Sequence, residues 1–214
     1  MSQLPDLTPH LTPSQRSELE SLQSPALIQA YLDGTLYSSE PINRSPLRVM
    51  QDRQAHCLDG GLFAAMVLRR LGFPPLIIDL LPEMNRDDDH VLAIFKVQGC
   101  YGAVAKSNYI GLRYREPIYR SLRELVMSYF ETYYNTEGER CLRAYTRPVN
   151  LKTYDPLDWP WNDSAADLVE KRLKTLKPIP LLTSAQIARL ECVDPLSYKA
   201  GMLAVNPAGL YKPH

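Results

Sequence analysis

The sequence predicts a single α+β domain over residues 1–214, in which a buried helix packs against an antiparallel sheet and extra helices lie at both ends. Three observations support this fold class. The composition, with 45% hydrophobic and 22% charged residues, is that of an ordinary globular protein large enough to form a core. An apolar segment with helical spacing covers residues 58–71. Strand-like segments follow it and are separated by turn residues.

The N-terminal region has signals for two short helices and a loop. Each helix has a hydroxyl N-cap and a first-turn proline, and the first also has a glutamine that completes a capping box. Residues 34–46 are rich in serine, proline and asparagine without a helical or strand period, so we expect an ordered loop that borders a cleft. The helix signals are Thr12, Pro13 and Gln15, then Ser24 and Pro25.

The core, at about residues 45–151, is expected to hold the helix and the sheet. The helix over 58–71 is apolar on nearly every side in its middle, which is typical of a buried helix, and it stops at Gly72 before two prolines. Strands then follow as an antiparallel meander, with a tight turn between the last two. The expected strands are 76–81, 90–97 and 101–105.

The second half of the chain completes this domain. Residues 121–134 have helical spacing, and residues 140–151 alternate as a strand does. Residues 152–214 are expected to form a helical C-terminal appendage, with one helix over 165–176 and another that begins at Thr183.

The charge balance and the cysteine pattern exclude several classes of function. Lys plus Arg and Asp plus Glu are equal at 24 each, so no net charge attracts nucleic acid or an anionic membrane. The first residues lack the basic and apolar parts of a signal peptide, and no apolar run is long enough to span a membrane. The four cysteines form no C-x-x-C pair. We therefore expect a cytoplasmic protein without nucleic-acid or membrane partners, a metal or a cofactor.

Cys57 begins the buried helix. A thiol at a helix N-terminus lies where unpaired main-chain amides and the macrodipole favour negative charge, which lowers the thiol pKa. Such a cysteine can also simply pack as a small apolar residue. Because it alone begins a helix that precedes a plausible base, we expect Cys57 to be the only strongly nucleophilic thiol, with Cys100, Cys141 and Cys192 reacting slowly.

His90 begins the second strand of the meander, after an acidic turn at 87–89 that is expected to be solvated. In an antiparallel meander this strand can bring the imidazole beside the helix N-terminus. A histidine there can take the thiol proton and later deliver it to a leaving amine. The pattern therefore predicts a catalytic pair of Cys57 and His90.

Three segments around this pair carry a resemblance to a known superfamily: CLDGGLFAA over 57–65, LRRLGFP over 68–74 and DHV over 89–91. Together they resemble the transglutaminase-like core of the papain-like cysteine proteases. In that core a cysteine heads a helix, a histidine lies on a following strand, and an acidic or amide residue on the next strand orients the histidine. The resemblance covers about residues 57–109 and implies acyl transfer, either to water or to an amine.

The resemblance also implies a third residue on the strand after His90, where an aspartate is usual but absent here. Asn108 is the candidate, because its amide oxygen can accept the imidazole N–H and fix the ring tautomer, and Ser107 is the alternative. Asn108 can equally be a turn residue at a strand end. The main-chain amide of Cys57 is the expected oxyanion donor, with Gln54 either a second donor or an ordinary loop residue.

Arginine and tyrosine alternate over residues 111–120. Arg113 and Arg115 are candidates to hold a substrate carboxylate or phosphate through forked hydrogen bonds. The alternative is a structural arginine network that ties a loop to a helix. A nucleic-acid surface formed by these residues and Arg120 disagrees with the neutral charge balance.

We therefore expect a cysteine-dependent acyl-transfer enzyme that acts on a peptide or on a small amide or acyl compound through Cys57, His90 and Asn108. The alternative is a catalytically inactive binding module that keeps the transglutaminase-like scaffold, because the usual aspartate is missing. Exposure of Cys57 in a pocket discriminates between the two.

Overall fold

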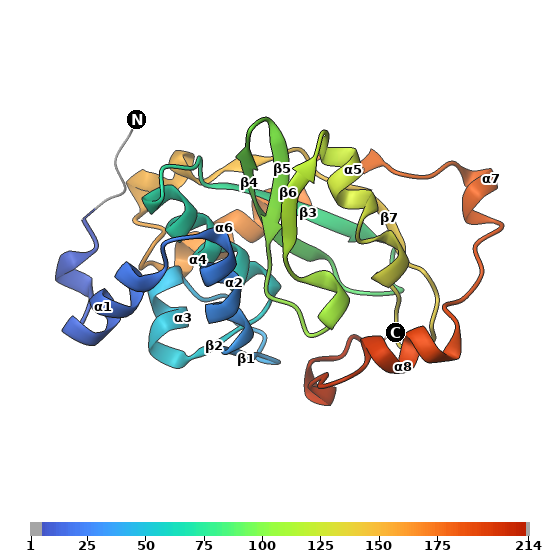
Figure 1. Ribbon diagram of the computed structural model, residues 1–214, viewed down its shortest axis with the longest axis horizontal. Helices are drawn as coiled ribbons and strands as arrows, with labels where there is room; N and C mark the ends of the chain where they lie inside the picture. Colours follow the sequence, from blue (N-terminus) through green and yellow to red (C-terminus); the bar gives the residue numbers. More distant parts are fainter. Residues whose placement is uncertain (1–5, 213–214) are drawn as a thin grey trace.

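The structure, a computed structural model, describes residues 6–212 as an α+β protein built around one large antiparallel sheet (Figure 1), which confirms the predicted class. The helices are α1 (Pro13–Ser21), α2 (Pro25–Asp33), α3 (Pro46–Asp52), α4 (Cys57–Arg70), α5 (Leu122–Met127), α6 (Asp163–Lys174), α7 (Ser184–Ile187) and α8 (Pro195–Gly201). The strands are β1 (Leu36–Tyr37), β2 (Gln54–Ala55), β3 (Leu76–Pro82), β4 (His90–Val97), β5 (Cys100–Val104), β6 (Arg115–Tyr119), β7 (Leu142–Tyr145), β8 (Val149–Asn150) and β9 (Ile179–Pro180).

The main sheet has the strand order β6-β5-β4-β3-β7-β9, and β8 also pairs with β3. Strands β3, β4 and β5 form the expected antiparallel meander. The register pairs Leu80 on β3 with His90, so the histidine lies at the very start of β4. Strands β1 and β2 form a separate parallel pair.

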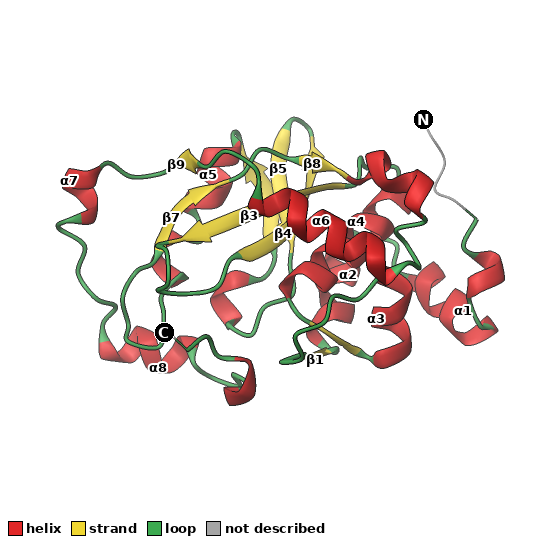
Figure 2. Cartoon of the chain, turned by 180° about the vertical axis from the view of Figure 1, so that it is seen from behind, coloured by secondary structure: helices red, strands yellow, loops and turns green. Residues whose placement is uncertain are grey.

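Two hydrophobic clusters lie on opposite faces of the sheet, because alternate residues of a strand point to opposite sides. Ile77 and Val91 belong to the cluster that includes residues of α2, α3, α4 and α6, and α4 is buried along almost its whole length, as expected. Ile78 and Leu92 belong to the cluster that includes α5. Figure 2 shows α6 beside α4 on the first of these faces.

Two glycines let the first turn of α4 lie directly against the sheet. A Cβ atom added to Gly60 would collide with Cβ of Lys106, just after β5, and one added to Gly61 would lie 2.8 Å from Cγ1 of Val91 on β4. A side chain at either position would push the helix away from the strands. The two glycines therefore set the close approach between β4 and the helix end that carries Cys57.

Several elements differ from the expectation. The helix expected over 121–134 ends at Met127, where the hydroxyl of Ser128 donates to the carbonyl oxygen of Leu125 at 2.6 Å. The alternation over 140–151 is divided into β7 and β8, and Pro148 between them has no N–H for a ladder bond. Helix α3 was not expected, and the appendage is not wholly helical because β9 joins the sheet beside β7.

Candidate active site

Cys57 is the first residue of α4, and its neighbours fix the start of that helix. The N-cap is His56, whose Nδ1 accepts the main-chain N–H of Leu58 at 3.2 Å. The carboxylate of Asp59 accepts the main-chain N–H of His56 at 3.2 Å and that of Arg44 at 2.7 Å. The thiol is therefore attached to a helix start that is capped and also bound to the preceding loop.

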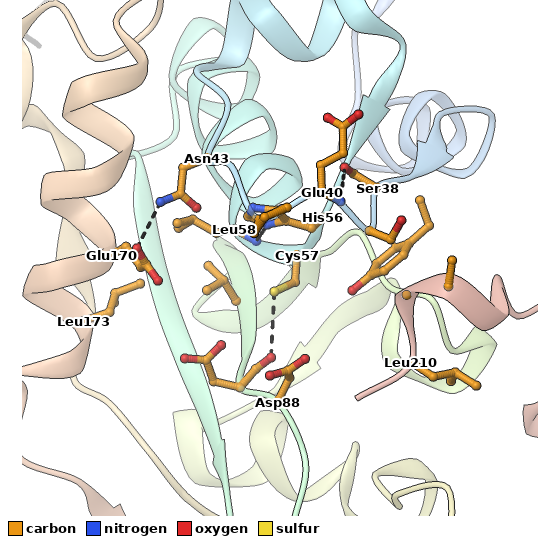
Figure 3. Close-up of a pocket in the computed structure, with 17 residues that line it drawn as sticks. Ser38, Glu40, Asn43, His56, Cys57, Leu58, Asp88, Glu170, Leu173 and Leu210 are labelled. Atoms are coloured by element: carbon orange, nitrogen blue, oxygen red, sulfur yellow. Dashed lines mark hydrogen bonds between the residues drawn. The ribbon is translucent and has the colours of Figure 1, made fainter. Parts of the chain in front are cut away.

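Cys57 lines a cleft of about 400 Å³ whose walls come from separate parts of the chain (Figure 3). The walls are α6, the loop that precedes α3, the turn before β4 and the C-terminal segment 208–210. Asn43 of the loop donates a hydrogen bond of 3.0 Å to Glu170 of α6 and so joins two walls. The loop over 34–46 borders a cleft, as the sequence predicted.

His90 is buried beside the cleft and is oriented by a main-chain atom. Its Nε2 lies 2.7 Å from the carbonyl oxygen of Leu112. Because a carbonyl oxygen only accepts, Nε2 carries the hydrogen, and Nδ1 is left as an acceptor. The pKa of His90 is lowered to about 4, mainly by burial; the hydrogen bond to Leu112 opposes this shift and the charge of Arg115 adds to it. The ring is therefore neutral at pH 7 and able to accept a proton at Nδ1.

Cys57 and His90 line the same small cavity of about 30 Å³, together with Ser107 and Asn108. The thiol donates its hydrogen bond elsewhere in this structure, to the main-chain oxygen of Asp89, with a sulfur-to-oxygen distance of 3.7 Å. The residues expected to form a triad thus meet at one cavity, and the thiol proton is held by a carbonyl group.

The pKa of the Cys57 thiol is raised well above its usual value, which is opposite to the sequence-based expectation. Burial is the main cause, and the negative charges of Asp89, Asp79 and Asp59 add to it. A hydrogen bond from the main-chain N–H of Val91 acts in the other direction. The helix N-terminus is therefore outweighed, since burial and the neighbouring carboxylates disfavour the thiolate.

The four thiols should consequently react in an order that reverses the sequence-based one. With limiting iodoacetamide at pH 7, Cys192 should be modified first because it is exposed, whereas Cys57 should react slowly because its pKa is raised well above the usual value. Cys141 should also react slowly, because burial raises its pKa to about 12. Peptide mapping of the adducts over a pH series measures this order, and preferential labelling of Cys57 at pH 7 would contradict it.

Asn108 does not orient His90 in this structure. Its Oδ1 accepts the main-chain N–H of Asn206 at 2.8 Å, and its Nδ2 donates to the carbonyl oxygens of Asn206 and Gly209. The predicted role of Asn108 is therefore wrong for this structure. The carbonyl oxygen of Leu112 is the acceptor that orients the imidazole instead. Ser107 lines the small cavity, where its hydroxyl accepts the main-chain N–H of Tyr109 at 3.0 Å.

Gln54, Arg113 and Arg115, the other candidate site residues, are not among the residues that line either cavity. Gln54 on β2 donates to Glu40 at 3.4 Å, so it is not placed as an oxyanion donor. Arg113 pairs with Asp33 at 3.3 Å. Arg115 donates to the carbonyl oxygen of Gly111 at 2.8 Å and to that of Ser128. Its guanidinium lies 3.9 Å from the ring centre of Tyr129. The arginines thus follow the structural alternative and not the substrate-binding one.

Sequence reasoning missed a pair of carboxyl groups beside the thiol. Asp79 on β3 is 1% exposed, and burial followed by repulsion from Asp89 raises its pKa well above the usual value. Burial likewise raises the pKa of Asp89, which is bonded to Asp79. Burial also raises the pKa of Asp87 to about 7, so the turn 87–89 is not simply solvated. The available signal was an aspartate inside the apolar run of β3.

No protein-family model matches this sequence, and a search of curated proteins finds no match. Within residues 6–212, no group of three or more His, Cys, Asp or Glu side chains is arranged to hold a metal ion. No helix in the described part of the chain is long and apolar enough to cross a membrane.

Proposed function

We propose that this chain is a cysteine-dependent acyl-transfer enzyme with a transglutaminase-like core, in which Cys57 is the nucleophile and His90 the general base. The supporting observation is that Cys57, at the start of a buried helix, and His90, at the start of a strand, line one small cavity at the edge of a larger cleft. The resemblance of residues 57–109 to that core agrees with this placement.

The proposed reaction starts from a neutral thiol and a neutral imidazole. Nδ1 of His90 takes the thiol proton as the sulfur attacks an acyl carbonyl, and Nε2 stays bonded to the carbonyl oxygen of Leu112. The imidazolium then protonates the leaving amine, which leaves an acyl group on the sulfur as a thioester. Water or an amine, deprotonated in turn by His90, attacks the thioester and restores the thiol. The substrate is a peptide or a small amide or acyl compound.

The first turn of α4 supplies an oxyanion donor for this reaction. The main-chain amides at the start of a helix have no acceptor within the helix, and Cys57 is the first residue of α4. An amide at this position stabilises the negative charge that develops on the attacked carbonyl oxygen. This assistance explains why the proton can leave a thiol of raised pKa during attack on a carbonyl, although the free thiolate is scarce.

Acylation by p-nitrophenyl acetate tests this function. The protein should release p-nitrophenolate at pH 7.5 and carry an acetyl group on the peptide that contains Cys57. Cys57→Ala should abolish that adduct and lower the release, whereas Cys192→Ala should leave the Cys57 adduct unchanged because Cys192 is exposed and is not part of the cleft lining. Release that is identical in the wild type and in Cys57→Ala would reject the proposal.

A catalytically inactive binding module is the second candidate, and one observation favours it. Burial holds Cys57 protonated and His90 neutral, so the pair lacks the ion pair that activates a thiol in advance. Absence of the acetyl adduct on Cys57 in a folded protein would favour this second function over the first.

A further inference from the structure

The C-terminal segment returns to the cleft and forms part of the wall of the cavity that Cys57 and His90 share. Ala208, Gly209 and Leu210 line the larger cleft, and Figure 3 shows Leu210 across the cleft from α6. Gly209 and Tyr211 line the small cavity that the thiol and the imidazole share. That cavity measures about 30 Å³, which is room for a water molecule and not for an acyl group with its leaving amine.

The side chain of Asn108 binds this segment, and it contacts only main-chain atoms of the segment through hydrogen bonds. Its side-chain amide makes three hydrogen bonds, from the N–H of Asn206 at 2.8 Å and to the carbonyl oxygens of Asn206 at 2.9 Å and Gly209 at 3.2 Å. Asn108 is 4% exposed, so these bonds are made away from water. Because they address only backbone atoms, they are available to any peptide that adopts the same turn.

Tyr37 adds a size requirement to this contact. Its carbonyl oxygen accepts the side-chain amide of Asn206 at 3.2 Å. A Cβ atom added to Gly209 would lie 2.8 Å from two carbon atoms of the Tyr37 ring, closer than such atoms approach. The surface formed by Asn108 and Tyr37 therefore fits a peptide main chain that has glycine at that position.

The segment is tethered but separable from the rest of the tail. Helix α8 is held by the hydroxyl of Tyr134, which donates to the carbonyl oxygen of Ser197, and by that of Tyr198, which donates to Thr136. The chain then passes through Ala204, whose φ of 58° is a strained conformation for alanine. The bonds that hold α8 are thus separate from those that hold residues 206–209, and a tether of this kind keeps the local concentration of a segment high.

We propose that Asn108 and Tyr37 form a peptide main-chain binding subsite beside Cys57. The chain's own residues 206–211 occupy this subsite and restrict access to the reacting cavity, so that Cys57 is acylated more slowly than it is when the segment is released. A peptide ligand with glycine in the position of Gly209 competes for this subsite by displacing the segment. The inference deepens the proposed function by naming a peptide as the ligand. The occupancy of the subsite is nevertheless measured without acyl transfer.

Full-length variants test the subsite from both sides. Asn108→Ala removes the three bonds, and Gly209→Val places a side chain against Tyr37 while the subsite itself stays intact. Both should raise amide hydrogen exchange over 205–211 and speed alkylation of Cys57 by N-ethylmaleimide at pH 9 by on the order of 10-fold or more. Leu203→Ala, an exposed change in the same tail, is the control and should alter neither.

Addition in trans distinguishes a subsite from a mere cover. The peptide AVNPAGLY, which is residues 204–211, should slow alkylation of Cys57 again in Gly209→Val but not in Asn108→Ala, and the same peptide with valine in place of glycine should fail in both. Unchanged exchange in both variants, or faster exchange without faster alkylation, would overturn the inference, as would absence of peptide protection. Peptide protection without any acylation of Cys57 would keep the subsite and reject the proposed enzyme.

Discussion

Replacing His90 with glutamine should slow acylation of Cys57 by p-nitrophenyl acetate by at least about 100-fold, which is the usual contribution of a general base. Glutamine can still donate an N–H to the carbonyl oxygen of Leu112, but it cannot take a proton from the thiol. The variant should therefore lose the general base while it keeps the hydrogen bond to Leu112. Single-turnover release of p-nitrophenolate at pH 7.5 measures the rate.

The pH profile supplies a second readout for the same variant. Burial lowers the pKa of His90 to about 4. Above that pH the imidazole is neutral and can act as a base, and below it the ring is already protonated and cannot. The wild-type acylation rate should therefore show no inflection near pH 6.5 and should fall as the pH approaches 4. His10→Gln, at a ring stacked on Trp161 and remote from the cleft lining, should retain the wild-type rate. A His90→Gln protein that is folded and as fast as the wild type would remove the base from the mechanism.

Replacing Arg44 with methionine should lower the free energy of unfolding by about 3 kcal/mol. The side chain of Arg44 is 1% exposed, bonds Glu40 and Asp52, and lies 3.7 Å from the carboxylate of Asp59, which is fully buried. Methionine fills similar space but leaves that carboxylate without its cation. Because Asp59 also caps α4, the loss should reach the helix start that carries Cys57. Urea denaturation measures the change.

Arg48→Met is the matched control for this prediction. Arg48 bonds the same Asp52 at 3.0 Å and also Asp163 at 3.0 Å, but its side chain is 45% exposed, so its loss should cost less than about 1 kcal/mol. Adding Asp59→Asn to Arg44→Met should recover part of the stability, since it removes the unpaired charge. Equal losses for the two arginine variants would show that burial at Arg44 contributes nothing.

The sequence predicted those parts of the fold that depend on local signals. Helix α4 and strands β3, β4 and β5 have periodicity and turn residues of their own, and the capping box at Thr183 is formed as expected. The short strand β9 was missed because its strand state depends on pairing with β7, more than thirty residues away along the chain. Helix α3 was missed although Ser45 and Pro46 repeat the N-cap and proline signal of α1.

The candidate site was predictable in its two reacting residues and not in their surroundings. The positions of Cys57 and His90 follow from a helix start and a strand start, which sequence patterns reveal. The use of Asn108 depends on a segment about a hundred residues later in the chain. The raised pKa of Cys57 depends mainly on burial and also on nearby carboxyl groups such as that of Asp79, which only the folded sheet brings near. Spacing alone carries no information on either effect.

The bond from His90 to the carbonyl oxygen of Leu112 has a consequence for how this site responds to mutation. A main-chain acceptor persists whatever side chain occupies position 112, so a substitution scan there would report packing of a buried leucine and nothing of the imidazole. A search for a third catalytic side chain would likewise score the site as incomplete. The acceptor can be moved only through the backbone, for example at Gly111, where an added Cβ would meet Thr132 at 2.5 Å. The orienting group of this histidine is thus encoded by the path of the chain and by no single residue type.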